Sequence, residues 1–191
     1  MMNEAISNGG GEEELVMESG SVVPDAPVIR AATPQDWPGI WSVIEPVIRE
    51  GETYPLDRDL DESAARAYWF AADKSVFVAL GPTGEVIGTY TLRPNSTGPA
   101  AHVANAGYAV RPDQRGKGVA QALCRHSLET ARRQGYRAMQ YNLVIATNHR
   151  AVRLWQHMGF TIIGALPGAF RHPKLGYVDA YIMYQELTRP S

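Results

Sequence analysis

A glycine-rich turn flanked by cationic side chains is the stretch of this sequence best suited to hold an anion. The turn consists of Arg115, Gly116, Lys117 and Gly118, and a helical pattern begins directly after it with Val119 and Ala120. Glycine has no side chain, so the backbone N–H groups of the turn can approach a large anion closely. The N-terminus of the following helix adds partial positive charge at the same point. These residue types at this spacing predict a phosphate-binding site.

The elements on either side must hold the turn in place. Before it, small and apolar residues recur at every second position from residue 104 to Val110, which is the period of a half-buried strand. After it, residues 119–133 gather apolar side chains on one helical face and leave mostly polar ones on the other. We therefore expect a strand, the turn and a helix in succession.

Two familiar nucleotide-binding motifs do not match this turn. A Walker A loop requires glycine where this chain has Arg111, and serine or threonine where it has Gly118. The dinucleotide fingerprint requires a third glycine, and Gln121 occupies that position. The turn instead resembles the Arg/Gln-x-x-Gly-x-Gly/Ala signature of the GCN5-related N-acetyltransferases (GNAT), read here as Arg115, Gly118 and Ala120. That resemblance implies that the anion is the pyrophosphate of acetyl-CoA.

Residues 148–160 are similar to the second signature of the same family, Asn-x-x-Ala-x-x-Leu-Tyr-x-x-x-Gly-Phe. The stretch begins with Asn148 and carries Trp155 where the family has tyrosine. Both signatures occur in the family's order, and the resemblance covers roughly residues 28–187. It implies the GNAT fold, an α/β (α+β) domain with a mixed, twisted, six- to seven-stranded sheet flanked by helices and with splayed central parallel strands. It also implies that Asn148 and Trp155 lie at the cofactor.

The resemblance gives catalytic roles to the strand before the turn. Its backbone N–H at about Tyr108 would stabilise the oxyanion, near a bulge expected at Ala106 and Gly107 because glycine permits irregular backbone. The backbone of Val110 would bind the pantetheine amides as an added strand would. Asn148, the other residue placed in the catalytic site, also suits the N-cap of the helix that follows it.

The acid and the base are left open at this point. An indole N–H is not a useful acid, so Trp155 cannot protonate the departing thiolate. The tyrosines that could replace the usual one are Tyr108, Tyr181 and Tyr184. A primary-ammonium acceptor could instead release its proton through water. The side chains considered as the base are His102, His172 and Asp179.

The acceptor site is predicted from loops and one strand. Thr53 and Tyr54 lie in a loop between two expected helices that wall the acceptor pocket in the related fold, and ordinary loop packing is their alternative role. Asn142 lies on a strand beside the expected cleft.

A loop expected over residues 164–176 contributes Arg171 and His172. Their positive charge over the cleft would favour a small acceptor with a carboxylate, because Arg pairs bidentately with one. A solvated surface charge is the alternative for Arg171. The sequence around residues 141–155 also resembles the GNAT branch that acts on proline analogues such as azetidine-2-carboxylate.

Length and composition set the domain organisation. The chain has 191 residues, of which 45% are hydrophobic, and this suits one compact domain. Residues 1–26 are rich in glycine, glutamate and serine and predict a disordered N-terminal tail, so that residues 27–191 form the acetyltransferase domain. Within it we expect a helix broken at Pro46, a helix over 61–72, a hairpin of strands 75–80 and 86–93, and strands 138–145 and 177–187.

Charge and composition also restrict the kinds of partner and compartment that we expect. The formal net charge of −2 gives no reason to expect binding to nucleic acid or to anionic membranes. The single cysteine, Cys124, falls on an apolar helix face and cannot form an internal disulfide. No apolar run is long enough to span a bilayer, and the acidic residues near the N-terminus are unlike a secretory signal. We expect a soluble, cytoplasmic protein without a metal site, and a homodimer is left open.

The resemblance implies an acetyl-CoA-dependent N-acetyltransferase that acts on the amine of a small molecule, such as an amino acid or a proline analogue. Acetylation of a protein N-terminus or lysine is one alternative, for which an open acidic groove would be the expected feature. A non-catalytic acetyl-CoA-binding module is the other, because the usual tyrosine is replaced by Trp155.

Overall fold

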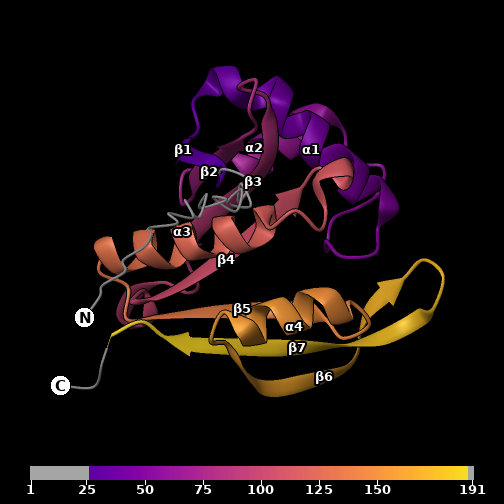
Figure 1. Ribbon diagram of the computed structural model, residues 1–191. Helices are drawn as coiled ribbons and strands as arrows, with labels where there is room; N and C mark the ends of the chain where they lie inside the picture. Colours follow the sequence, from indigo (N-terminus) through magenta and orange to yellow (C-terminus); the bar gives the residue numbers. More distant parts are fainter. Residues whose placement is uncertain (1–25, 189–191) are drawn as a thin grey trace, which may run out of the picture.

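The computed structural model describes residues 26–188, so that the predicted disordered tail lies almost wholly outside the described residues. Seven strands form one sheet in the order β1-β2-β3-β4-β5-β7-β6 (Figure 1). The strands are β1 (Val28–Ala31), β2 (Ser75–Leu80), β3 (Val86–Pro94), β4 (Val103–Val110), β5 (Ala138–Ile145), β6 (Thr161–His172) and β7 (Gly176–Glu186). The helices are α1 (Trp37–Glu50), α2 (Glu62–Trp69), α3 (Val119–Arg133) and α4 (His149–His157), with short 3-10 turns at η1 (Pro34–Asp36), η2 (Gly98–Ala100) and η3 (Pro112–Gln114).

The centre of the sheet is its irregular part. Strands β4 and β5 run parallel, whereas all other neighbours are antiparallel. The parallel pairing joins only Val103 to Ala138 and Ala104 to Met139, and beyond these two pairs the strands diverge. The mixed seven-stranded sheet with splayed central strands is therefore confirmed.

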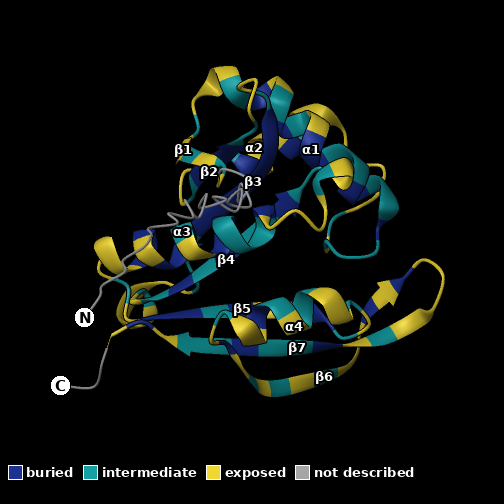
Figure 2. Cartoon of the chain, viewed as in Figure 1, coloured by how far each residue is buried: buried dark blue, intermediate teal, exposed yellow. Residues whose placement is uncertain are grey.

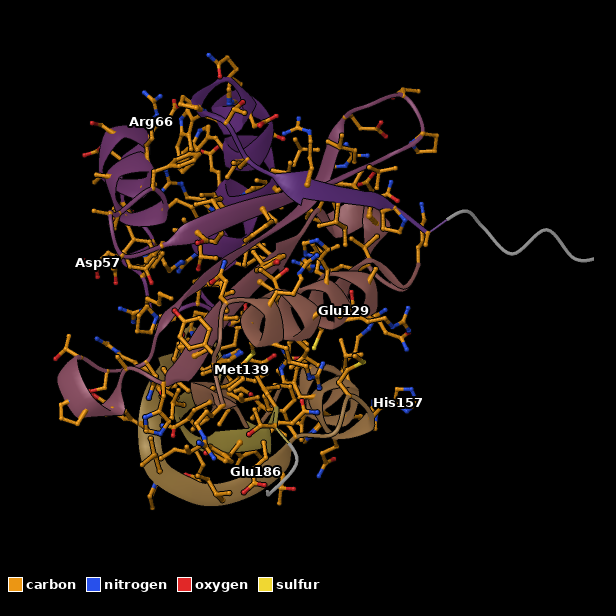
Figure 3. The ribbon with its side chains drawn as sticks, turned by 90° about the vertical axis from the view of Figure 1, so that its left-hand side faces the viewer. Asp57, Arg66, Glu129, Met139, His157 and Glu186 are labelled. Carbon is orange, nitrogen blue, oxygen red and sulfur yellow. The ribbon has the colours of Figure 1, made fainter. Side chains whose placement is uncertain are left out.

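Helices cover both faces of the sheet. Apolar residues of α1 and α2 share one buried cluster with Val78 and Ala109, whereas residues of α3 and α4 share another with Ala104 and Met139. Figure 2 shows buried residues in the central strands and at intervals along α1 and α3, and in Figure 3 Arg66 of α2 and Glu129 of α3 lie on different sides of the sheet. None of the helices within residues 26–188 is long and apolar enough to cross a membrane.

Helix α1 runs unbroken through Pro46, contrary to the predicted break. Proline removes one helical hydrogen bond and crowds the preceding turn, at a cost of about 3 kcal/mol. Ile40 and Ile44 before the proline and Val47 and Ile48 after it are all buried on one face against the sheet. Each such side chain stabilises the fold by about 1.5 to 3 kcal/mol, so packing outweighs the local penalty.

The predicted loop over residues 164–176 is wrong. Strand β6 continues to His172 and forms a hairpin with β7, with a register shift between Leu166 and Phe170. The shift takes up Pro167 and its neighbours, and β6 is an edge strand, where proline is tolerated. The residues that signalled a loop therefore mark an irregularity within a strand.

A second register shift changes which side chains of β5 share a face. Simple alternation would place Met139, Tyr141 and Leu143 together, and Met139 and Tyr141 do lie in the same buried cluster. The shift between Tyr141 and Val144 then places Val144 in that cluster, whereas Leu143 packs near Phe170 in a separate one. One displaced residue thus exchanges the faces of all the residues after it.

Candidate functional site

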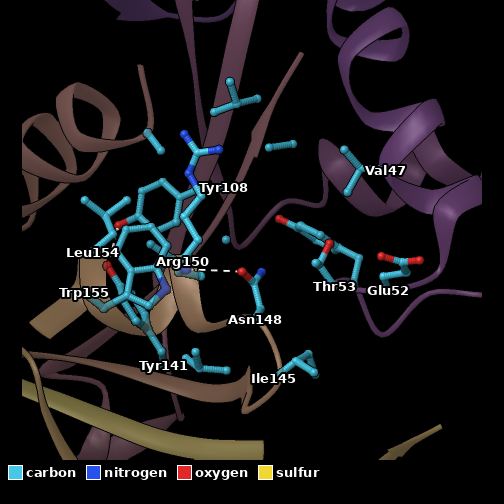
Figure 4. A pocket seen from close by; sticks show the side chains of 18 of the residues that line it. Val47, Glu52, Thr53, Tyr108, Tyr141, Ile145, Asn148, Arg150, Leu154 and Trp155 are labelled. Carbon is cyan, nitrogen blue, oxygen red and sulfur yellow. Dashed lines mark hydrogen bonds between the residues drawn. The ribbon is translucent and has the colours of Figure 1, made fainter. Parts of the chain in front are cut away.

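A pocket of about 760 Å³ opens where β4 and β5 diverge. Its lining comes from the end of α1, the loop over residues 52–55, strands β3, β4 and β5, and the N-terminal ends of α3 and α4. In Figure 4, Leu154 and Trp155 lie on one side, Val47 and Glu52 on the other, and Asn148 between them. The volume is within the range of small-molecule sites.

The end of the pocket at α3 forms a cradle of backbone N–H groups, which we call the glycine cradle and which consists of Gly116, Gly118, Val119 and Ala120. Gly116 (φ +91°) and Gly118 (φ +82°) both have left-handed backbone, which favours glycine. The first helical bond of α3 runs from Ala122 N to Gly118 O (3.0 Å), so the N–H groups of the residues between them have no helical acceptor. The predicted turn thus has the left-handed glycines and the unpaired N–H groups that an anion site needs, and anion binding there stays a prediction.

Of the cationic side chains around the glycine cradle, one is already paired with a carboxylate and another lies beside the turn. Arg115 donates to both carboxylate oxygens of Glu50, at 2.9 and 3.2 Å. Lys117 is exposed and is not among the lining residues. Arg150 lies beside the turn, where a Cβ on Gly116 would be only 2.9 Å from its Nη2. Sequence reasoning missed Arg150, and its place two residues after Asn148 in the second signature is the signal that would have found it.

The backbone of β4 presents hydrogen-bonding groups to the gap. Arg111 N donates to Ile87 O (3.0 Å) and Asn95 N donates to Val103 O (2.7 Å), so the odd-numbered residues of β4 bond to β3. The N–H groups of Tyr108 and Val110 therefore face the space from which β5 has diverged.

The bulge expected at Ala106 and Gly107 is wrong, because the register between β3 and β4 is continuous. Divergence of the neighbouring strand, rather than a bulge, leaves the N–H groups of β4 open to the pocket.

The Tyr108 hydroxyl is engaged in the core. It lies 2.6 Å from Ser127 Oγ and 2.8 Å from Tyr141 Oη. Burial raises the pKa of both tyrosines well above the ordinary value. The Trp155 ring lies 5.0 Å from the Tyr108 ring, centroid to centroid, and both line the pocket. These hydroxyls are consequently poor candidates for the acid.

Among the other acid and base candidates, only His172 lines the pocket; Tyr181, Tyr184, His102 and Asp179 do not. His172 is buried, and its Nδ1 accepts from Lys174 N (3.2 Å) and Leu175 N (3.3 Å). A neutral ring whose Nδ1 is an acceptor carries its proton on Nε2. The Nδ1 lone pair is therefore already used within the hairpin, which leaves His172 poorly suited to act as the base.

Thr53 and Tyr54 both line the pocket, as predicted. The Tyr54 hydroxyl is buried and has no hydrogen-bond partner among the described residues, and burial strongly raises its pKa. A Cβ on Gly107 would lie 2.7 Å from this oxygen, so only glycine leaves room for it. The ring packs near Trp69, with 5.8 Å between centroids. A buried hydroxyl without a partner, in a ligand-sized pocket, is suited to contact a ligand.

Of the other residues predicted to bind the acceptor, Asn142 lines the pocket and Arg171 does not. Asn142 lines the pocket, where it donates to Asn95 Oδ1 (2.7 Å) and accepts from Gln140 Nε2 (2.9 Å). Arg171 alternates with buried neighbours on β6, is exposed, and does not line the pocket. Arg93 of β3, which sequence reasoning missed, does line it.

Asn148 is the N-cap of α4, as predicted. Its Oδ1 accepts from Ala151 N at 3.1 Å (Figure 4). Because the oxygen is used by the cap, the NH₂ group is the part of the side chain left for a ligand. The structural and the binding role are therefore compatible.

Comparison with known proteins gives this geometry a family. The Acetyltransferase (GNAT) family model matches residues 40–160. The chain is 32% identical to N-acetyltransferase aca1 of Schizosaccharomyces pombe over 151 residues, 71% of this chain and 72% of that protein.

Two solved structures are similar. A GCN5-related N-acetyltransferase from Kribbella flavida matches with a TM-score of 0.80 and 40% identity, covering 84% of this chain and 98% of that one. The protein yncA from Salmonella typhimurium, solved with its cofactor acetyl-CoA, matches with a TM-score of 0.75 and 23% identity over 86% of this chain and 96% of that one, which shows the fold alone. The family model spans more than half of the sequence, and the glycine cradle and the gap between β4 and β5 accompany it. This chain therefore belongs to the GNAT acetyltransferase family and is an acyltransferase.

Proposed function

We propose that the protein is an acetyl-CoA-dependent N-acetyltransferase that acetylates the amine of a small molecule, an amino acid or a proline analogue being within this class. Its family supports acetyl transfer, and the similar Salmonella typhimurium protein was solved with acetyl-CoA. When bound, acetyl-CoA supplies a thioester carbonyl as electrophile and a thiolate as leaving group.

The residues of the glycine cradle fit the donor's pyrophosphate. Val119, Ala120 and Gln121 at the start of α3 line the pocket, their N–H groups have no helical acceptor, and the helix dipole adds positive charge there. Arg150 beside Gly116 supplies a cation that no carboxylate of the described residues neutralises. The open N–H of Val110 suits the amides of the pantetheine arm.

The chemistry relies on backbone and water more than on acidic side chains. The N–H of Tyr108 faces the gap, where it can donate to a carbonyl oxygen as negative charge develops. The lining carboxylates are both paired, Glu50 with Arg115 and Glu52 with Lys174. The bond from Lys174 also holds the pKa of Glu52 below its usual range, which makes it a weak base. We therefore assign loss of the amine proton to water.

One contact favours a small acceptor over a peptide. Lys174 Nζ lies 2.7 Å from Glu52 Oε1, joining the β6–β7 hairpin to the loop after α1 across the cleft. These two residues are 122 positions apart in the chain, Glu52 in the loop after α1 and Lys174 in the turn between β6 and β7. We infer that this link hinders an extended peptide from lying through the site. The pairing of both lining carboxylates also argues against an acidic peptide groove.

Release of CoA thiol tests the proposal. Purified protein with acetyl-CoA is assayed against a panel of amino acids and small amines, and in parallel against peptides with free N-termini and lysines. Turnover with members of the small panel at least about 10-fold above the peptides is the expected result. Faster turnover with peptides would favour protein acetylation, and acetyl-CoA binding without turnover on any acceptor would favour a non-catalytic module.

A further inference from the structure

We propose that Arg93 binds a carboxylate of the acceptor, so that the enzyme prefers amines of the amino-acid type over amines that lack an acidic group. The inference rests on the proposed function and concerns the part of the pocket that we call the acceptor end. The acceptor end consists of Tyr54, Tyr68, Arg93, Asn105 and Gly107, all of which line the pocket.

Strand β3 places Arg93 on the correct face. Thr91 pairs with Gly107, and Arg93 pairs with Asn105 one step along the same ladder. Residues two apart on a strand project from the same side, about 7 Å apart. Arg93 therefore projects from the face on which the Tyr54 hydroxyl lies against Gly107. The acceptor end thus combines the buried, unpartnered hydroxyl of Tyr54, at Gly107, with the guanidinium of Arg93, whose strand position is two residues from the partner of Gly107.

The guanidinium of Arg93 is largely free to bind a ligand. Its side chain is 40% exposed, and among the described residues it makes a single hydrogen bond, from Nη1 to Asp73 Oδ2 at 3.4 Å. That distance is long beside the usual 2.7 to 2.9 Å of a charge-assisted bond, and a single bond uses one of five N–H donors. The bond to Asp73 uses only Nη1, so the other N–H donors of the Arg93 guanidinium are left for a carboxylate of the ligand.

The other lining arginines are placed differently. Arg115 is held by both oxygens of Glu50, and Arg150 lies beside Gly116 in the glycine cradle. Arg93 is therefore the arginine that the pocket lining provides at the acceptor end.

The surroundings of Arg93 carry excess positive charge. Lys74 Nζ lies 3.3 Å from the centroid of the Tyr68 ring. Burial and the nearby Arg93 lower the pKa of Lys74 to about 8, so the two cations repel one another. Asp73 supplies one negative charge against these two positive ones. An anionic group bound at Arg93 would restore the balance, whereas a second cationic group would worsen it.

Matched acceptors test the inference. Values of kcat/KM are measured from CoA release, at saturating acetyl-CoA, for pairs such as alanine and ethylamine, phenylalanine and phenethylamine, and proline and pyrrolidine. The proteins are the unaltered enzyme, Arg93→Ala, Arg93→Lys and Arg125→Ala. Arg125 is an exposed arginine of α3 outside the pocket lining and serves as the matched control.

We expect the unaltered enzyme to prefer the acid of each pair. Arg93→Ala should lower kcat/KM for the acids about 10- to 100-fold and leave the amines within about twofold, because a charge-assisted contact is lost. Arg93→Lys should recover part of the loss. The KM for acetyl-CoA and the melting temperature should match those of Arg125→Ala, since Arg93 is half exposed and outside the glycine cradle.

Two results would overturn the inference while leaving the proposed function intact. One is equal use of acid and amine by the unaltered enzyme, and the other is an equal loss for both in Arg93→Ala. Release of CoA with peptides and with neither member of any pair would instead refute the proposed function, and the inference with it.

Discussion

Replacing Tyr54 with phenylalanine should make the protein more stable and less active. In the ligand-free protein the Tyr54 hydroxyl is buried without a hydrogen-bond partner among the described residues. Such a group costs about 1 to 3 kcal/mol relative to its solvation in water. Phenylalanine keeps the ring that packs near Trp69 and removes only the oxygen that lies against Gly107. Removing one oxygen creates little cavity. The change in the free energy of unfolding is therefore set by the relief of the buried, unpaired hydroxyl and should be stabilising.

The size of both effects follows from these contacts. We expect Tyr54→Phe to raise the free energy of unfolding by about 1 kcal/mol, or the melting temperature by about 2 to 4 °C for a domain of this size. If the hydroxyl contacts the acceptor, its loss removes a hydrogen bond worth about 0.5 to 1.5 kcal/mol. The value of kcat/KM for the acceptor should then fall by about 3- to 10-fold, with the KM for acetyl-CoA unchanged.

Two other tyrosines provide controls. The Tyr108 hydroxyl contacts Ser127 Oγ and Tyr141 Oη, so Tyr108→Phe should destabilise the protein by about 1 to 2 kcal/mol. Tyr177 is 75% exposed and outside the pocket lining, so Tyr177→Phe should change neither property. The measurements are denaturant unfolding without ligand and initial-rate kinetics. A loss of stability in Tyr54→Phe, or unchanged kcat/KM, would refute the assignment of this hydroxyl to the acceptor end.

Two further predictions concern the glycine cradle and the start of the domain. Gly118→Asp should abolish acetyl-CoA binding measured by calorimetry, because a carboxylate would repel the anion and the left-handed backbone (φ +82°) disfavours a side chain; unchanged affinity would remove the cradle from the site. Asp36→Asn should destabilise the protein by about 1 kcal/mol at pH 7. Arg30 donates two bonds to Asp36 (2.7 and 2.8 Å) and holds its folded-state pKa far below the usual range, so this stability is present above the unfolded pKa of about 4 and lost as pH falls. Unfolding of both proteins is measured between pH 7 and pH 2. The difference should begin to shrink below about pH 4 and keep shrinking toward the folded-state pKa, so a difference as large at pH 2 as at pH 7 would contradict this.

The backbone geometry of the turn and helix ends that we assign to the cofactor could be predicted from the sequence because its determinants are local. The left-handed backbone at Gly116 and Gly118, the helix that starts at Val119 and the cap at Asn148 each depend on residues within a few positions. Short-range geometry of this kind is encoded in residue type and spacing. The order of strands and helices followed from the same periodic signals.

The face of each side chain near the acceptor was decided by the tertiary structure. On β6 and β7 the register shift after Leu166 turned a predicted loop into a strand, which left Arg171 exposed and His172 in the pocket. From Leu166 to Phe170 the chain of β6 takes four steps against two on β7, and pairing with β7 then fixes the face of each residue that follows. No local pattern in the sequence records that register.

The acceptor end depends on contacts between distant parts of the chain. Arg93 reaches the pocket because β3 pairs with β4, and the Tyr54 hydroxyl is buried because Gly107 leaves room for it. The ion pair of Glu52 with Lys174 joins residues that no spacing rule relates. The sequence by itself determined the fold and the turn that we assign to the donor's phosphates, since both rest on local signals. Only the packing of β1–β4 and their helices against β5–β7 and theirs decided which side chains line the acceptor end.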